Sequence, residues 1–166
     1  MTRVVFPKAV MTATKYGKNL IALSMYGKGK AFIGAHLLVA RQPASEPTEY
    51  VTLHLLGQGI EVTLKAFLLL LDYDKYVVQL RKPLGHNLVK TAEAAITAFG
   101  LNPMRPALKA ELEAVSTPYS NHMLRYGGIG DIFIAPSSIH RDSVFRRIAA
   151  AIRLAEREPR HVRRVL

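Results

Sequence analysis

Apolar residues dominate the stretch from Tyr50 to Leu71, which is long enough for about six helical turns. Spacings of three and four residues place many of them on one face, which predicts a helix. This face consists of Leu53, Leu56, Ile60, Leu64, Phe67 and Leu71. The opposite side is also apolar, through Val51, Leu55, Val62, Ala66 and Leu69. A helix that is apolar around most of its circumference is typical of the centre of a helical bundle.

One narrow polar stripe interrupts this helix, formed by His54, Gln58, Glu61 and Lys65. Their spacing keeps them on one line along the helix. Buried polar groups need partners, because burying them alone is energetically expensive. Two interpretations are open. Glu61 and Lys65 form an ion pair at the seam between two helices, with Gln58 capping a neighbouring carbonyl. Alternatively, the stripe is one wall of a polar cleft that holds a ligand, a nucleotide or a partner.

Shorter apolar repeats on either side predict further helices. Residues 30–41 fit a short buried helix, and the proline-containing segment 42–49 is a linker in which Ser45, Thr48 or Glu49 begins the central helix. Asn87 is a natural N-cap for a helix that ends at Gly100. Additional helical segments are expected at residues 74–80, 107–115 and 121–125.

The last helix is expected to follow an N-cap at Ser137 or Ser138 and to reach about residue 158. The glycine-rich segment 127–135 predicts a short extended excursion before it. The pattern as a whole predicts an all-α, antiparallel bundle of four to five helices. We expect this bundle to span residues 28–158. A basic N-terminal arm, a candidate for mobility, would occupy residues 1–27, and a basic tail residues 159–166.

The net charge of +11 is concentrated at the two ends of the chain. Residues 1–45 hold seven lysines or arginines and no acid, and residues 141–166 hold eight arginines and three acids. Residues 46–140 hold eight bases and nine acids. Basic ends suit contact with nucleic acid or another polyanion, and they equally suit a solvated surface.

Several classes of protein and site are not expected. The chain has no cysteine, and we find no secretion signal and no apolar run long enough to span a bilayer, so we expect a cytoplasmic protein without disulfides or a membrane segment. The six histidines are spread singly, which gives no metal site. No dinucleotide fingerprint or nucleophile elbow occurs, and no cofactor is expected.

Three short motifs, taken in order, resemble the HEPN domain family. They are Glu61 followed by Lys65-Ala66 on the central helix, His86-Asn87-Leu88 at the start of the next helix, and the pair Arg125-Tyr126. The resemblance covers about residues 30–157. It implies a helical bundle, often a homodimer, linked to RNA or nucleotide binding, to toxin–antitoxin pairs and to defence systems, with an antitoxin or a nucleotidyltransferase as a possible partner. The candidate ligand-binding residues are then His54, Gln58, Glu61, Lys65, Asn87, Arg125 and Tyr126.

Some members of that family are metal-independent ribonucleases, with a histidine four to six residues after an arginine. Arg81 and His86 satisfy this spacing. The arginine would hold the scissile phosphate and the histidine would transfer the proton of the 2′-hydroxyl. Lys82 departs from the family's usual Asn, Asp or His, and Pro83 and Gly85 predict a loop where active members have a helix.

Three functions are therefore open. The chain is an RNA- or nucleotide-binding domain, a metal-independent endoribonuclease that uses Arg81 and His86, or a non-catalytic protein-interaction module. In the non-catalytic cases His86 simply marks the start of a helix.

Overall fold

The computed structural model describes residues 14–43, 45–126 and 135–157. These residues form helices and turns, and no strand occurs within these ranges. The helices, in chain order, are α1 (Lys15–Val39), α2 (Glu46–Leu71), α3 (Tyr73–Val77), α4 (Leu88–Ala98), α5 (Pro106–Ser120), α6 (Met123–Tyr126), the 3-10 helix η2 (Pro136–Ser138) and α7 (Asp142–Arg157). The predicted all-α class is confirmed.

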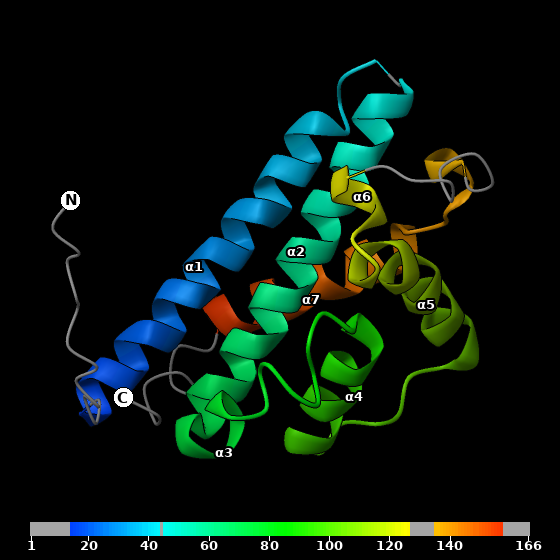
Figure 1. Ribbon diagram of the computed structural model, residues 1–166. Coiled ribbons are helices and arrows are strands. Elements are labelled where there is room, and N and C mark those ends of the chain that lie inside the picture. Colours follow the sequence, from blue (N-terminus) through cyan, green and yellow to red (C-terminus); the bar gives the residue numbers. More distant parts are fainter. Residues whose placement is uncertain (1–13, 44, 127–134, 158–166) are drawn as a thin grey trace, which may run out of the picture.

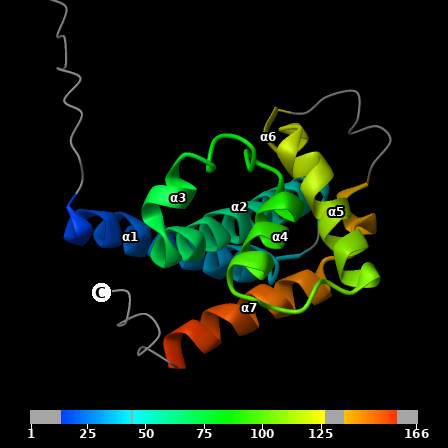
Figure 2. The same ribbon diagram turned by 90° about the horizontal axis from the view of Figure 1, so that it is seen from below.

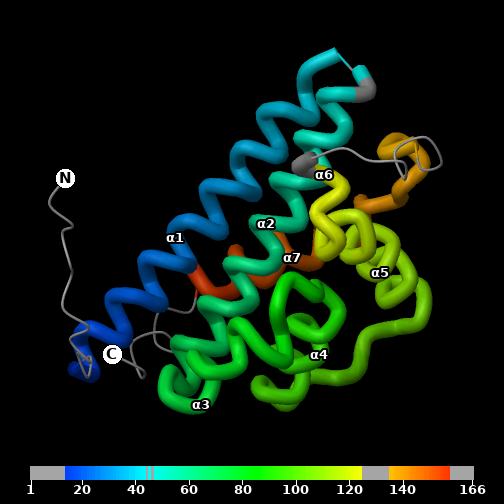
Figure 3. The backbone as a smooth tube through the Cα atoms, in the orientation of Figure 1, coloured from blue at the N-terminus to red at the C-terminus, as the bar shows by residue number. Residues whose placement is uncertain are grey.

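The two longest helices, α1 and α2, lie side by side as an antiparallel hairpin (Figure 1). Helices α4 and α5 pack against α2, and α7 crosses the hairpin on another side, as the view from below shows (Figure 2). The backbone path in Figure 3 shows α3, the turn segment 78–87 and α4 following one another along α2. The turn segment is therefore held against the central helix.

Glycines allow α1 and α2 to approach closely. A Cβ atom added at Gly29 would lie 2.3 Å from Oγ1 of Thr63, and one added at Gly59 would lie 2.5 Å from Cδ1 of Ile33. Real Cβ atoms do not come this close to other atoms, so a larger residue at either position would force the helices apart. The pairing of the hairpin thus depends on two small residues, one on each helix.

The central helix is confirmed, and it begins as expected. The Ser45 side chain accepts a hydrogen bond from the Thr48 N–H, and Pro47 occupies the first turn. Leu53, Leu56 and Ile60 are buried as predicted. The expected core face is wrong at the last residue of the helix, where Leu71 is 42% exposed, although the preceding Leu68, Leu69 and Leu70 are buried.

The expectation that no apolar run is long enough to span a bilayer is wrong for the central helix. Residues Pro47–Leu71 are long and apolar enough to cross a bilayer by length and composition alone. About two thirds (67%) of the most apolar window is buried inside the protein. The buried pair Glu61 and Lys65 on the same helix fits a protein core better than a lipid environment.

The largest correction concerns the N-terminal third. Residues 15–27, expected to belong to an arm, form the first half of α1, and the helix expected at 30–41 is its second half. Glycine disfavours an isolated helix, but packing against α2 outweighs this propensity, since Ala22 is fully buried and Gly29 sits at the hairpin contact. Residues 1–13 of the expected arm and the expected tail at 159–166 lie outside the described residues.

Other predicted boundaries hold with local changes. Asn87 caps α4, and Gly100, with φ of +62°, follows the α4 C-cap. Helix α5 extends to Ser120, five residues beyond the expected end, through Pro118. The prediction that Ser137 or Ser138 caps the last helix is wrong, because both belong to η2 and α7 begins at Asp142. The glycine-rich excursion falls largely on residues 127–134, which lie outside the described residues.

Candidate functional site

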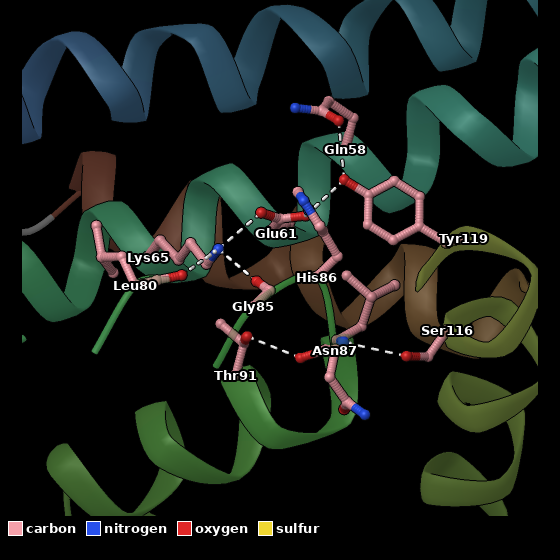
Figure 4. Close-up of polar contacts among 11 residues, drawn as sticks. Gln58, Glu61, Lys65, Leu80, Gly85, His86, Asn87, Thr91, Ser116 and Tyr119 are labelled. Atoms are coloured by element: carbon pink, nitrogen blue, oxygen red, sulfur yellow. Dashed lines mark hydrogen bonds and ion pairs between the residues drawn. The ribbon is translucent and has the colours of Figure 1, made fainter. Parts of the chain in front are cut away.

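The carboxylate of Glu61 is the centre of a buried polar network (Figure 4). Its Oε1 atom lies 2.7 Å from the Lys65 ammonium. Its Oε2 atom accepts a hydrogen bond of 2.6 Å from the Tyr119 hydroxyl and lies 3.0 Å from Nδ1 of His86. Glu61 is only 5% exposed. All three partners of this carboxylate therefore come from the protein itself, from three separate segments of the chain.

Lys65 fastens the turn segment 78–87 to the central helix. Its ammonium donates to the carbonyls of Leu80, at 3.1 Å, and Gly85, at 2.6 Å, besides its contact with Glu61. An ammonium has three hydrogen-bond donors, so all three of its N–H groups are used. The segment between these two carbonyls carries Arg81. His86 follows immediately after Gly85.

Burial and hydrogen bonding act in opposite directions on Glu61. Burial raises the pKa of its carboxyl group, but hydrogen bonds from Lys65, Tyr119 and His86 and the charge of Lys65 outweigh it, so the pKa is lowered below its ordinary value. Glu61 is therefore ionised at neutral pH. An ionised carboxylate only accepts hydrogen bonds, so Nδ1 of His86 must carry the proton in this contact.

The His86 ring is oriented by this contact and remains accessible. Its side chain is 48% exposed, although its Nδ1 atom is bound to a buried carboxylate. With the proton on Nδ1, the Nε2 atom of the neutral ring is a base, and it has no hydrogen-bond partner among the described residues. A carboxylate that orients an imidazole also stabilises the imidazolium formed when that imidazole takes up a proton.

Tyr119 closes the network from α5 and is itself almost fully buried, at 1% exposure. Its hydroxyl also lies 2.8 Å from Oε1 of Gln58. A Cβ atom added at Gly57 would lie 2.5 Å from Cδ2 of the Tyr119 ring. The absence of a side chain at Gly57 is what allows the tyrosine to reach Glu61.

Arg81 lies in the turn segment 78–87, as the sequence predicts, and not on a helix. Its side chain is exposed and makes no hydrogen bond or ion pair with the described residues. Lys82 beside it is also exposed. A Cβ atom added at Gly85 would lie 3.6 Å from the Arg81 carbonyl oxygen, so the chain folds back on itself just before His86. Two exposed cations and the half-exposed imidazole thus share one short segment.

The remaining sequence candidates have varied surroundings. Asn87 is a helix cap, since its Oδ1 atom accepts a 2.9 Å hydrogen bond from the Lys90 N–H. The His54 ring packs against Tyr119, with ring centroids 5.8 Å apart. The Arg125 and Tyr126 backbone belongs to α6, and their side chains lie outside the described part of the structure.

The geometry bears on both interpretations of the polar stripe. Glu61 and Lys65 form the predicted ion pair, and α2 contacts both helix α5, through Tyr119, and the turn segment at this pair. Both residues are buried, so they cannot line an open cleft. Instead, Glu61 orients His86 and Lys65 holds the turn segment through their hydrogen bonds. Within the described ranges, no group of three His, Cys, Asp or Glu side chains is placed to hold a metal ion.

Sequence reasoning missed Tyr119 and His122. Tyr119 follows the buried Val115 by four residues on α5, so its burial was predictable, but its contact with Glu61 depends on packing between distant segments. His122 follows the end of α5, and its ring centroid lies 5.3 Å from that of His86. Neither contact has a signal in local spacing. No family model, curated protein or solved structure matches this chain.

Proposed function

We propose that this chain is a HEPN-like helical bundle that binds RNA or a nucleotide at the turn segment 78–87. The observation that carries the proposal is an accessible imidazole, fixed by a buried carboxylate, on the same segment as two exposed cations. Arg81 and Lys82 supply charge for phosphate groups, and His86 supplies a hydrogen-bonding ring. Lys65 holds the segment in place, which lowers the entropy lost when a ligand binds.

Fluorescence anisotropy with a labelled single-stranded RNA, measured over a series of salt concentrations, tests this proposal. The test variant is Arg81→Ala/Lys82→Ala. If both residues contact phosphates, the slope of log affinity against log salt falls by about 1.4, since each single-strand phosphate contact contributes about 0.7. The matched control is Arg146→Ala/Arg147→Ala, which removes the same charge from an exposed face of α7.

The control separates site binding from general attraction to a basic protein. We expect the α7 variant to keep a slope closer to the wild-type value than the Arg81/Lys82 variant does. Equal losses in the two variants would mean that the RNA responds to net charge alone. A wild-type protein that binds neither RNA nor nucleotides at low salt would end the proposal.

A second candidate function is metal-independent endoribonuclease activity, and the contact between Glu61 and His86 favours it. A histidine that is held by a carboxylate through Nδ1 and whose side chain is 48% exposed is arranged as a general base. Arg81 would stabilise the charge on the phosphate. RNA cleavage in EDTA, compared between wild type, Arg81→Ala and His86→Ala, tests this activity. Thermal melts must show that both variants fold. Cleavage unchanged in folded His86→Ala would rule out the role of this residue.

A further inference from the structure

A second histidine lies beside His86 at the end of α5. His122 comes directly after Asn121, the C-cap of that helix, and its ring meets the His86 ring at an interplanar angle of 70° with centroids 5.3 Å apart. Tyr119, three residues earlier, is anchored on Glu61. The same buried carboxylate therefore holds His86 directly and, through the end of α5, holds the segment from which His122 projects.

The local structure at His122 is unfavourable by itself. Its φ angle is +59°, a left-handed conformation that costs a non-glycine residue about 1–2 kcal/mol. Its Nδ1 atom is buried and has no hydrogen-bond partner in the described part of the chain. Glycine would remove the backbone strain, and an apolar residue would avoid the unpaired nitrogen. Strain and an unpaired polar atom at one residue are typical of positions retained for function.

We infer that His122 is a second catalytic residue for cleavage of single-stranded RNA, which donates a proton to the leaving group while His86 accepts one from the nucleophile. This inference rests on the endoribonuclease activity proposed above. In-line displacement at phosphorus places the attacking and leaving oxygens on opposite sides of one phosphate. A proton acceptor and a proton donor on neighbouring rings can serve these two oxygens.

The reaction balances without metal or cofactor. Nε2 of neutral His86 takes the proton of the 2′-hydroxyl, and the 2′-oxygen forms a bond to the adjacent phosphorus. The bond between phosphorus and the 5′-oxygen breaks, and the imidazolium of His122 gives the proton on its Nε2 atom to that oxygen, since its Nδ1 atom is buried. The products are a 2′,3′-cyclic phosphate and a 5′-hydroxyl. His86 then returns a proton to solvent and His122 gains one, which restores the starting state.

The test compares two RNA substrates that differ only in the leaving atom, in the presence of EDTA. One has the natural 5′-oxygen at a single cleavage site, and the other has a bridging 5′-sulfur, whose thiolate leaves without being protonated. The variant is His122→Asn, because asparagine tolerates positive φ. We expect His122→Asn to cleave the oxygen substrate 10²–10⁴-fold more slowly, a loss of about the size general acid catalysis provides. The sulfur substrate should be cleaved within a few-fold of the wild-type rate.

His86→Ala and His140→Asn are the reference variants. His86→Ala should be slow on both substrates, since loss of the base affects both. His140→Asn makes the same change at an exposed histidine after η2 and should match wild type on both. If His122→Asn melts early, His122→Gly replaces it, because glycine relieves the left-handed strain.

The outcomes are distinguishable. Recovery of activity on the sulfur substrate alone supports the inference, because a purely structural defect would slow both reactions. Equal slowing of both substrates by a folded variant, or a wild-type rate on the oxygen substrate, overturns the role of His122 but leaves the ribonuclease activity standing. Absence of cleavage by wild type on either substrate overturns the ribonuclease activity, and the inference fails with it.

Discussion

Replacing Lys65 by methionine is the most direct test of the buried network. The change keeps most of the side-chain volume but removes the ammonium that contacts the Glu61 carboxylate and the carbonyls of Leu80 and Gly85. Glu61 would then be an ionised group, 5% exposed, without its cation. Removing one partner of a buried ion pair costs about 3–5 kcal/mol, because the remaining charge is left uncompensated.

The loss should be visible by two methods. Urea denaturation followed by circular dichroism should show a free energy of unfolding lower by about 3–5 kcal/mol. For a chain of this size, each kcal/mol lowers the melting temperature by about 2–4 °C, so the variant should melt about 6–20 °C earlier. Lys109→Met is the matched control. It breaks a 2.7 Å pair with Glu93 on the surface, where solvent screens the charges, and should melt close to wild type.

A double-mutant cycle separates the pair from its surroundings. Glu61→Gln/Lys65→Met removes both charges, so it should lose about 1–3 kcal/mol less than the sum of the two single losses. Strict additivity of Glu61→Gln and Lys65→Met would show that the two side chains do not stabilise each other. A loss below about 1 kcal/mol in Lys65→Met would refute the claim that this lysine secures the turn segment.

Three further predictions concern the network and a buried histidine on α1, His36. Gly57→Ala places a Cβ atom against the Tyr119 ring, which should lower the free energy of unfolding by about 1–3 kcal/mol. Gly27→Ala on α1 meets no atom within 4 Å and should raise it by up to about 1 kcal/mol. Urea midpoints that shift in the same direction in the two variants would contradict this reasoning. Tyr119→Phe removes the hydroxyl that donates a hydrogen bond to Glu61, so the free energy of unfolding should fall by about 1.5–3 kcal/mol. A urea midpoint equal to that of wild type would show that the hydroxyl is dispensable. Burial lowers the pKa of His36 below its ordinary 6.5, so the unfolded chain binds a proton first and stability should fall as pH drops below about 6.5. Because the pKa of Glu61 is lowered in the folded protein, a second loss of stability should begin below about pH 4.5. Melting curves across this pH range should show that His36→Gln abolishes the loss of stability that begins below about pH 6.5 and keeps the loss below about pH 4.5. If His36→Gln still shows the loss below about pH 6.5, His36 is not its source.

The local parts of this structure were predictable from the sequence. The ion pair of Glu61 and Lys65 follows from their spacing on one helix, and the Asn87 cap from its place before an apolar repeat. Both features arise within a few residues of one chain segment. The predicted spacing of Arg81 and His86 is likewise local, and the structure places both on a turn, as the proline and glycine between them indicate.

Features that depend on distant segments were not predictable. Three glycines argued against a helix before residue 30, and only the face of α2 explains why α1 forms there. Tyr119 reaches Glu61 across a separation of 58 residues, and the Lys65 contacts with the turn carbonyls span 15 and 20. Hydrophobic periodicity reports which face of a helix is buried but not which side chain it meets.

The two hydrogen bonds from Lys65 to the turn segment also limit how related chains can vary. One ammonium holds the carbonyls of Leu80 and Gly85, so the length of chain between them is set by the reach of a single side chain. An insertion there would move the imidazole of His86 off its carboxylate, whereas substitutions at Arg81 and Lys82 would change only the surface. Distant relatives should therefore keep the number of residues between Leu80 and Gly85 but differ in which residues these are. A search template built on the spacing from Glu61 through Lys65 to His86 should detect them better than overall identity does.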